Sequence, residues 1–335
     1  MRAFVTGGSG FLGRNLLAAL REGGDDVRAL ARSTAAMDVV ARLGATPVRG
    51  DLGTPDAMRD GMAGCDVVLH AAALLDRAGS AAQYHQVNVD GTRNVLAAAR
   101  AAGVPRLVYV STEAVLFGGG PLRGVDETHP RPPHPIGLYG TTKGRAEGEV
   151  LAANGQGLAT VVVRPRFIWG EGDTTVLPQL VQAARDGTFL WIGGGRYLTS
   201  TCHVRNVCEG LILAAERGRP GEIYFVTDGA PVEFRAFATA LFRSQGVEPG
   251  DRSVPPWAGR LAASVAETAW HLLRLRGAPP VDRAAFATIG EEVTVSDAKA
   301  RRELGYRGAV TMEAGLAGMA AASRAAGVRP PSVGA

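Results

Sequence analysis

Lysine is scarce in this sequence. Lysine and arginine together number 36, and only Lys143 and Lys299 are lysines, which leaves 34 arginines. The arginines are spread along the chain, and the closest clusters, at 274–276 and 301–302, have no aromatic residues among them. With charged residues at 20% and a formal net charge of +4, the chain lacks the basic patch typical of nucleic-acid binding. At Lys299 an arginine could do equally well, whereas Lys143 marks a position where an ammonium is expected to do what a guanidinium cannot.

Cysteine is also rare. Cys65, Cys202 and Cys208 are an odd set of three without a CxxC spacing, which is typical of a reducing compartment rather than of a disulfide framework. His203 lies between the last two, but the spacing does not complete a tetrahedral zinc site. We therefore expect no metal site and a cytoplasmic location.

Long apolar runs are missing too. No run approaches the roughly 18 residues that span a bilayer. The first apolar strand begins at residue 2, so we expect neither a membrane span nor a signal peptide. The chain has 335 residues, of which 46% are hydrophobic. That is enough for one large α/β domain, or for a domain with a smaller partner.

What the sequence does contain is an alternation of short apolar runs with helix-like segments, such as 12–21 and 92–102, over its first two thirds. This alternation predicts an α/β fold of the Rossmann type, a doubly wound parallel sheet with helices on both faces. The strands are expected at 3–6, 27–31, 46–49, 67–70, 107–111, 160–163 and 223–227.

Domain boundaries follow from a change in composition. Residues 1–164, completed by a strand near 222–228, are expected to form the cofactor-binding domain. Residues 165–221 and 229–326 include stretches richer in Trp, Phe, Pro and Gly, and they predict a smaller C-terminal substrate-binding lobe. The end of the chain, 327–335, is expected to be a disordered tail.

The first expected strand runs into a glycine-rich turn. Gly7, Gly10 and Gly13 form a GxxGxxG pattern that opens an amphipathic segment. The pattern allows a tight turn, a close approach of the backbone to a pyrophosphate, and a helix N-terminus whose free N–H groups face that anion. We predict a dinucleotide site that includes Gly7, Gly10, Phe11, Leu12 and Gly13.

Three further segments extend this site. A carboxylate at the end of the second strand would bind the ribose 2′-hydroxyl of NAD, but the sequence has Arg32, which can pair with the 2′-phosphate of NADP. Asp51 and Leu52 follow the third strand and place a carboxylate near the adenine amino group. Ala71 and Ala72 follow the fourth strand, where small side chains let the cofactor lie against the backbone. We expect NADP(H), with NAD(H) as the alternative.

Tyr139 and Lys143 have the YxxxK spacing, which on a helix puts both side chains on one face. A free phenol titrates near pH ~10, and a nearby cation lowers its pKa by stabilising the phenolate. A compact ammonium can reach the ribose hydroxyls of a cofactor while it stays near the phenol. Ser111 and Thr112 end the fifth strand and supply a hydroxyl to the same cleft. These residues predict a catalytic set.

The order of these motifs resembles the extended short-chain dehydrogenase/reductases. The runs that carry the resemblance are TGGSGFLG, HAAA, NVDGT, YVSTEAV, YGTTK and RPRFIWG. The second half, with HVRNVCEGLILAAE, GEIYFVTDGAPVEF and EVTVSDAKARRELGY, is most similar to the 3β-hydroxysteroid dehydrogenase-like branch. The resemblance implies Tyr139 as proton donor or acceptor and Lys143 as the residue that holds the ribose. It implies Thr112, aligned through Val115, as the catalytic hydroxyl, with Ser111 as the alternative.

The resemblance also assigns supporting roles. It implies that Asn88 bonds to backbone rather than to substrate, and that the segment from Pro165 to Ile168 lies beside the nicotinamide. Relatives with this fold are often dimers, so a homodimer is expected.

The expected activity is the NADP(H)-dependent interconversion of a bulky apolar ketone and a secondary alcohol, of steroid-like or β-keto-acyl type. A sugar-nucleotide epimerase or reductase is the alternative. Against it, Ala114 follows Glu113 where dehydratases carry a second acid, and Thr199 stands where epimerases carry an arginine, although Arg196 is near enough to substitute. A redox sensor that binds NADP(H) without turnover is the third hypothesis, which the intact YxxxK pair disfavours.

Large apolar residues gather in the second lobe. Core packing is the simplest explanation for any one of them, and together they predict a roomy apolar pocket. They are Trp169, Phe189, Trp191, Tyr197, Trp257, Trp270 and Leu272. Residues 257–275 predict an amphipathic helix with one face made by Trp257, Leu261, Val265, Leu272 and Leu275. We expect this helix to cap the substrate pocket, and we do not expect membrane contact. An interfacial helix in a membrane surface is the alternative.

Overall fold

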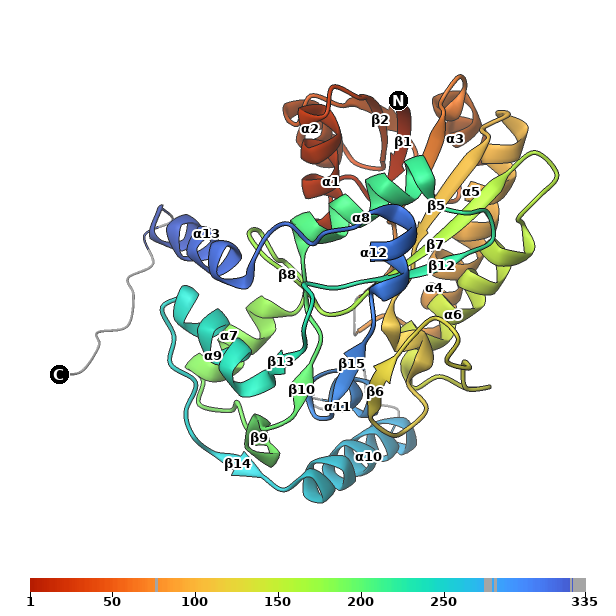
Figure 1. The fold of residues 1–335 in the computed structure, drawn as a ribbon. Helices are drawn as coiled ribbons and strands as arrows, with labels where there is room; N and C mark the ends of the chain where they lie inside the picture. The colour runs from red at the N-terminus through yellow and green to blue at the C-terminus, as the bar shows by residue number, and fades with distance from the viewer. Residues whose placement is uncertain (76–77, 274–278, 280–281, 326, 328–335) are drawn as a thin grey trace.

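A seven-stranded parallel sheet organises the molecule (Figure 1). The computed structural model describes residues 1–75, 78–273, 279, 282–325 and 327. The sheet has the order β12-β7-β5-β4-β1-β2-β3. Its strands are β1 (Arg2–Thr6), β2 (Asp26–Ala31), β3 (Thr46–Arg49), β4 (Val67–His70), β5 (Arg106–Val110), β7 (Ala159–Pro165) and β12 (Ile223–Val226). Each overlaps an expected strand, so the predicted Rossmann-type sheet is confirmed.

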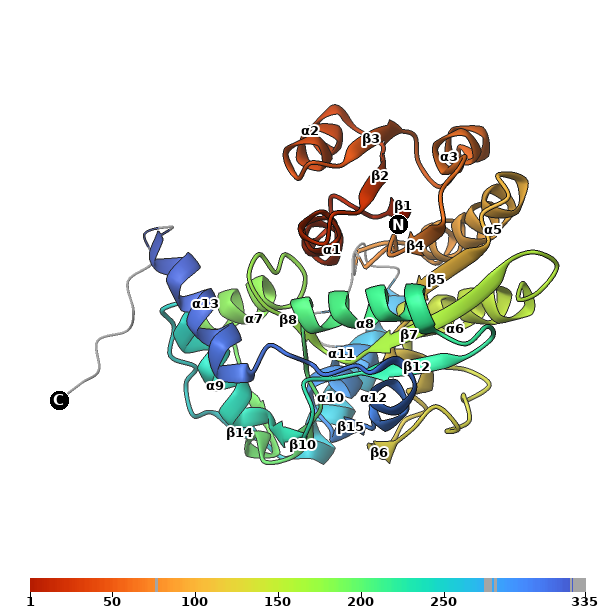
Figure 2. The same cartoon turned by 45° about the horizontal axis from the view of Figure 1, so that its top comes forward.

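Helices cover both faces of this sheet (Figure 2). Side chains of β1 point alternately to the two layers, with Ala3 and Val5 in one core and Phe4 in the other. One layer contains α1 (Phe11–Glu22), α2 (Thr34–Arg42), α8 (Val204–Arg217) and α12 (Ala298–Leu304). The other contains α3 (Pro55–Met62), α5 (Gly91–Ala101) and α6 (Gly137–Ala152), and α4 (Ala81–Tyr84) with the π-helix η1 (His85–Asp90) leads into α5.

The strand order reverses between β1 and β4. The chain fills one edge of the sheet with β2 and β3, and then returns to build the other edge from β4. Ligands of open α/β sheets bind outside the carboxyl ends of the strands at such a reversal. The glycine turn after β1 and the alanines after β4 lie at this point, which is where the sequence predicts a cofactor.

The smaller lobe lies below the sheet in the view of Figure 1. It contains a four-stranded sheet of order β13-β10-β15-β6 and the pairs β11-β8 and β14-β9. Its strands are β6 (Leu122–Val125), β8 (Ile168–Trp169), β9 (Trp191–Ile192), β10 (Leu198–Thr199), β11 (Cys202–His203), β13 (Val232–Glu233), β14 (Ser253–Val254) and β15 (Val293–Val295). Its helices are α7 (Leu177–Arg185), α9 (Phe234–Ser244), α10 (Pro256–Leu272), α11 (Arg283–Ile289) and α13 (Met312–Ala325), with the 3-10 turn η3 (Gly193–Gly195). The 3-10 turn η2 (Glu113–Leu116) follows β5 and contacts α6. The strand β6 belongs to this sheet although it precedes residue 165.

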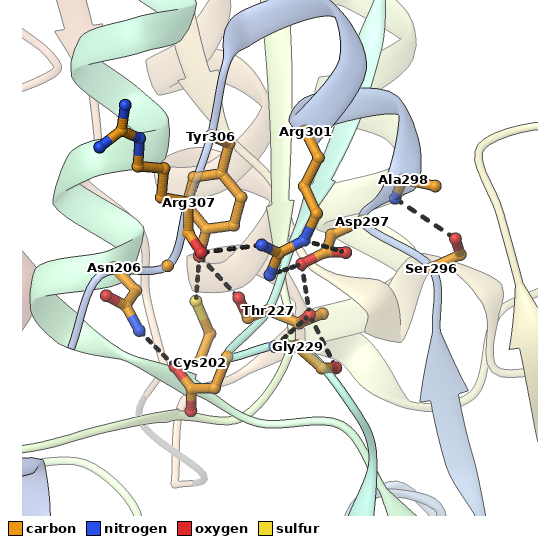
Figure 3. A network of polar contacts seen from close by, with 12 residues as sticks. Cys202, Asn206, Thr227, Gly229, Ser296, Asp297, Ala298, Arg301, Tyr306 and Arg307 are labelled. Atoms are coloured by element: carbon orange, nitrogen blue, oxygen red, sulfur yellow. Dashed lines mark hydrogen bonds and ion pairs between the residues drawn. The ribbon is translucent and has the colours of Figure 1, made fainter. Parts of the chain in front are cut away.

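A polar network fastens the C-terminal segment to the end of β12 (Figure 3). The Tyr306 hydroxyl donates to the carbonyl of Thr227 at 2.7 Å. The Thr227 hydroxyl donates to Asp297 Oδ2 at 2.8 Å, and Arg301 binds both oxygens of that carboxylate. The segment around α12 is therefore fixed to the large sheet, although it follows the second lobe in sequence.

Four of the aromatic residues of the second lobe form a core, which is the simplest explanation that the sequence offered for each of them. Trp169 and Trp191 are fully buried, and Phe189 and Tyr197 pack against the same cluster. Phe189 meets Trp191 edge to face, with ring centroids 4.9 Å apart. These side chains stabilise the second lobe by packing with one another.

The predicted capping face of α10 is exposed. Trp257 is 70% exposed, Leu261 and Val265 are each 58% exposed, and Leu272 is 78% exposed. The helix packs through small residues instead, because Ala263 is fully buried and a Cβ on Gly259 would lie 3.0 Å from the Phe286 ring of α11. The prediction that the apolar face covers a pocket is therefore wrong.

Parts of two predictions fall on undescribed positions. Leu275 and most of the tail at 327–335 lie outside the described residues. Among the helices that the structure describes, none combines the length and the apolar character needed to cross a membrane.

Two leucine-to-alanine variants test this account of burial. Leu211 of α8 is fully buried, so Leu211→Ala is expected to lower the free energy of unfolding by about 2–5 kcal/mol. Leu261→Ala on the exposed face of α10 is expected to change it by no more than about 0.5 kcal/mol. Urea denaturation followed by circular dichroism measures both. Equal losses would show that the α10 face is covered in the folded protein.

Candidate active site

The glycine turn after β1 closes on its own backbone. The N–H of Gly10 donates to the carbonyl of Gly7 at 3.0 Å, and a Cβ on Gly13 would lie 2.0 Å from that carbonyl oxygen. Gly7 has a φ of 77°, and a Cβ there would lie 2.8 Å from the backbone of Ala72. Phe11, which follows Gly10, begins α1, and the N-terminus of this helix has no side-chain cap. The turn thus leaves free N–H groups at a helix start, as a pyrophosphate requires.

A buried histidine holds the neighbouring segment against this turn. His70 Nδ1 lies 2.6 Å from the Thr6 hydroxyl, which accepts the N–H of Ala72 at 3.2 Å. His70 Nε2 lies 3.0 Å from the Thr92 hydroxyl. Burial, with a smaller effect of Lys143, lowers the pKa of His70 to about 3, so the ring is neutral. Sequence reasoning missed this residue, because one histidine at the end of a strand carries no distinctive pattern.

Arg14 is a second residue that sequence reasoning missed. Its guanidinium donates to the carbonyl of Ser9 at 3.1 Å and to the carbonyl of Gly172 at 3.0 Å. The side chain therefore links the glycine turn to the loop after β8. Nothing in the sequence distinguishes it from the other arginines.

Two exposed arginines lie at the carboxyl ends of the neighbouring strands β2 and β3. Arg32 is exposed and makes no hydrogen bond or ion pair with the residues that the structure describes. Arg49 is also exposed. It lies on β3 beside Ala31 of β2, because the parallel register pairs these two positions. Asp51 Oδ1 accepts the N–H of Gly53 at 2.8 Å. Arg49 could be found only from the register, which the sequence does not reveal.

The helix α6 carries Tyr139 and Lys143 one turn apart, as predicted. Lys143 is buried, its Nζ donates to the carbonyl of Val110 at 2.6 Å, and it lies 4.0 Å from the centroid of the Tyr109 ring. Burial lowers the pKa of Lys143 to about 7, against an opposing attraction by Glu147. The ammonium thus sits in a site where it exchanges its proton near neutral pH.

Tyr139 has the opposite shift from the one expected. Removal from water and the nearby Glu113 carboxylate raise the pKa of Tyr139 above its ordinary value. The ammonium of Lys143 is bound to Val110, so the expected lowering of the phenol pKa by Lys143 is wrong for this arrangement. The phenol is a protonated acid at neutral pH.

The two adjacent hydroxyls have different partners. The Thr112 hydroxyl donates to Glu113 Oε2 at 2.8 Å, and Thr112 opposes the rise in the pKa of Tyr139. The Ser111 hydroxyl donates to Glu147 Oε2 at 2.6 Å, in a buried cluster. Of the two hydroxyls, Thr112 is therefore the one that influences the pKa of Tyr139.

The side chain of Asn88 forms hydrogen bonds with the backbone, as the resemblance implied, and this prediction is confirmed. Its Oδ1 accepts the N–H of Leu74 at 2.7 Å, and its Nδ2 donates to the Thr142 hydroxyl at 3.0 Å. Thr142 lies between the two catalytic candidates on α6. The π-helical turn η1 is thereby tied to the middle of the catalytic helix.

The segment from Pro165 to Ile168 turns sharply after β7. Phe167 has a φ of 44°, a conformation that a residue with a side chain rarely adopts. Its ring meets those of Phe234 and Phe237 edge to face, at 6.5 and 5.6 Å. The turn lies at the carboxyl end of β7. Thr112 follows the carboxyl end of the neighbouring strand β5, so both lie at the same end of the parallel strands.

The three residues that looked like metal ligands have separate contacts. Cys202 Sγ lies 3.8 Å from the Tyr306 hydroxyl, and His203 Nδ1 accepts the N–H of Arg205 at 3.3 Å. Burial raises the pKa of the Cys208 thiol to about 12. Within the described ranges, no three His, Cys, Asp or Glu side chains gather as a metal ion would require.

The chain matches known proteins over most of its length. The model of the 3-beta hydroxysteroid dehydrogenase/isomerase family matches residues 4–256. The chain is 56% identical over 316 residues to 4-hydroxy-2-methyl-3-oxo-4-farnesyl-3,4-dihydroquinoline-1-oxide ketoreductase from Stigmatella aurantiaca, covering 94% of this chain and 95% of the relative. It is 38% identical to 2-alkyl-3-oxoalkanoate reductase from Stenotrophomonas maltophilia, covering 97% of this chain and all of the relative.

Solved structures agree with this relationship. A dTDP-glucose 4,6-dehydratase from Streptomyces venezuelae, solved with NAD, superposes with a TM-score of 0.76 at 26% identity and covers 97% of both chains. The chain belongs to the 3-beta hydroxysteroid dehydrogenase/isomerase family, and it is a ketone/alcohol oxidoreductase of the extended short-chain dehydrogenase/reductase superfamily.

Proposed function

We propose that the enzyme uses NADPH to reduce the keto group of a molecule that carries a long apolar substituent. The observation that supports the reaction is that Lys143 of α6 binds the carbonyl of Val110, next to Ser111 and Thr112, at the carboxyl end of the strands where the glycine turn also lies. The substrate class is supported by the two relatives above, whose names specify a farnesylated ketone and a 2-alkyl-3-oxoalkanoate.

The residues at the sheet edge fit a dinucleotide. The turn around Gly7 and Gly13 is too close-packed for any side chain, and the start of α1 offers backbone N–H groups to a pyrophosphate. Phe11 and Leu12 would continue this surface, and Ala71 with Ala72 would lie under the nicotinamide half. When bound, the nicotinamide would supply the hydride that adds to the carbonyl carbon.

Two side chains of α6, together with Thr112 before η2, would handle the proton. Tyr139 would donate its proton to the carbonyl oxygen, which suits a phenol that stays protonated at neutral pH. Thr112 would hydrogen-bond the carbonyl oxygen of the substrate. Lys143 would move from the carbonyl of Val110 to the cofactor ribose, and its pKa of about 7 would let it pass a proton on.

The preference for NADP(H) rests on the adenosine end of the site. Arg32 is unengaged within the described part of the chain, and Arg49 lies on the adjacent strand. Two guanidinium groups near one ribose would bind a 2′-phosphate by charge-assisted hydrogen bonds. Asp51 would bind the adenine through its remaining oxygen. NAD(H) would lack the phosphate that these arginines bind.

The position that distinguishes epimerases supports the ketoreductase proposal. Thr199 is buried and accepts a hydrogen bond from Arg166, whose guanidinium is already paired with Glu113. That guanidinium is therefore not free to neutralise a nucleotide diphosphate, and Arg196 is exposed to solvent. A homodimer and a cytoplasmic location remain predictions.

A substrate panel tests the proposed activity. NADPH absorbance at 340 nm should fall with the farnesylated quinoline N-oxide ketone and with a 2-alkyl-3-oxoalkanoate, because both present a ketone on an apolar chain. Steroid 3-ketones serve as the bulky ring comparison. UDP- and dTDP-sugars are the controls for the epimerase alternative, and turnover confined to these sugars would contradict the proposal.

Removal of the phenol oxygen of Tyr139 tests the role of this residue as the proton donor. Tyr139→Phe is expected to lower kcat by roughly 10²–10⁴-fold, the usual contribution of a positioned proton donor, and to leave NADPH affinity unchanged. Fluorescence titration of NADPH checks the affinity. Tyr224→Phe, which removes a phenol bound to Glu303, should keep wild-type turnover. Full activity of Tyr139→Phe would exclude Tyr139 as the acid.

Charge reversal at the adenosine end tests the cofactor preference. Arg32→Asp is expected to weaken NADPH binding by about 10–100-fold, since a hydrogen bond to a charged group contributes about 1.5–3 kcal/mol, and to improve NADH binding. Arg42→Ala on α2, another exposed arginine, is the matched control and should change neither affinity. Tighter binding of NADH than of NADPH by the wild-type enzyme would overturn the assignment.

A further inference from the structure

Arg14 joins the glycine turn to the smaller lobe. Its Nη1 donates to the carbonyl of Ser9 at 3.1 Å, and its Nη2 donates to the carbonyl of Gly172 at 3.0 Å. Ser9 belongs to the turn after β1. Gly172 belongs to residues 170–176 between β8 and α7, which we call the α7 loop. Because the donor is charged, both hydrogen bonds are of the stronger, charge-assisted kind.

The bridge begins at a part of the backbone that is already constrained. The N–H of Arg14 donates to the carbonyl of Gly10 at 2.9 Å, so Arg14 lies in the first turn of α1. Long side chains on a helix point back toward its N-terminus, which brings the guanidinium to Ser9. The N–H of Gly10 is in turn bound to the carbonyl of Gly7. A ligand held by the free N–H groups at this helix start would therefore fix Ser9 as well.

The bridge ends at an exposed part of the α7 loop. Gly172 is exposed and has a φ of 77°, a conformation that favours glycine. Apart from its chain neighbours, a Cβ on Gly172 would have only Arg14 Nη2 within 4 Å among the residues that the structure describes. Arg14 is therefore the contact that holds this part of the loop against α1.

The end of the α7 loop is packed into the smaller lobe. Asp173 Oδ1 accepts the N–H of Thr175 at 2.6 Å, and Asp173 Oδ2 accepts the N–H of Leu177 at 3.2 Å, at the start of α7. Leu177 is buried in the core of the smaller lobe, against which Phe167 also packs. A shift of the loop would therefore be passed on to the start of α7 and to the turn at Phe167.

We propose that Arg14 is a positioning residue through which a bound dinucleotide orders the α7 loop of the smaller lobe. This inference rests on the proposed cofactor site at the glycine turn. The guanidinium binds both carbonyls at once only while Ser9 and Gly172 keep their present separation. Occupation of the turn fixes Ser9, the bridge then fixes Gly172, and the start of α7 is held in place for the ketone.

Amide hydrogen exchange of residues 170–176 tests the proposal without turnover. In the wild type, saturating NADPH should slow exchange of the loop at least about fivefold, the lower end of the usual coupling between two sites. Arg14→Met keeps an unbranched side chain and removes both donors. In this variant NADPH should still slow exchange at residues 9–13 but leave the loop unchanged. Equal slowing of the loop in both proteins, or no slowing in the wild type, would overturn the proposal.

The ratio of the exchange rates with and without NADPH separates positioning from a structural role. A bridge that only stabilised the fold would hold the loop equally in both forms, so its removal would speed both rates alike and leave their ratio as in the wild type. Arg14→Gln has one amide nitrogen in place of the two that bind the carbonyls. It provides a folded protein if Arg14→Met unfolds, and the same loss of the ratio is expected.

Steady-state kinetics with NADPH and a 2-alkyl-3-oxoalkanoate give a second readout. Arg14→Met should raise KM for the ketone about fivefold or more and leave kcat within about twofold, because the proton-handling residues are unchanged. A fall in kcat with an unchanged KM would contradict a role in positioning the loop. Arg21→Met is the control. Arg21 is exposed on the same helix and donates to the carbonyl of Asp25, so this variant should match the wild type.

Failure of the proposed function can be told apart from failure of this inference. The exchange experiment needs no ketone, so a wild type that reduces none of the panel would fail as a ketoreductase while the exchange ratio still decides the role of Arg14. If only NADH binds, the same experiment with NADH decides it, and the cofactor preference alone is corrected. If neither dinucleotide slows exchange at the glycine turn, the cofactor site and the coupling through Arg14 are both wrong.

Discussion

The geometry of the site depends on the buried ion pair between Glu147 and Arg164. Glu147 is fully buried on α6, and Arg164 of β7 binds both of its carboxylate oxygens. Arg131 lies 3.4 Å from the same carboxylate. Removal of one partner of such a pair leaves an uncompensated buried charge, which destabilises a protein by about 3–5 kcal/mol. The pair fixes the rotation of α6 on the sheet, and with it the direction in which Tyr139 points.

Two parallel arrangements follow from this anchor. The side chains of Arg164 and Arg166 leave the end of one strand, and each meets a carboxylate that orients one hydroxyl after β5. One arrangement sets the helix, and the other sets the hydroxyl beside the phenol. A short stretch of chain thus controls both the scaffold and the proton-handling groups.

The sequence alone was sufficient to predict the features that depend on local interactions. The glycine turn, the YxxxK spacing and the alternation of strands depend on backbone conformation and on period, and all of them could be read without a structure. The contacts of Glu113 and Arg49 depend instead on which strands are neighbours and in which register, so the sequence did not reveal them. The prediction that the apolar face of α10 covers a pocket was wrong for a related reason. Its apolar pattern indicated a buried side, but the tertiary packing used the small residues Gly259 and Ala263.

The backbone of Phe167 connects the two lobes energetically. A residue with a side chain in the left-handed region costs roughly 1–2 kcal/mol, which the edge-to-face contacts with Phe234 and Phe237 help to offset. Those two phenylalanines belong to the core of the smaller lobe. Loosening of that core would release the turn and, with it, the neighbouring Arg166. The packing of the smaller lobe is therefore coupled to the catalytic edge through the turn at Phe167.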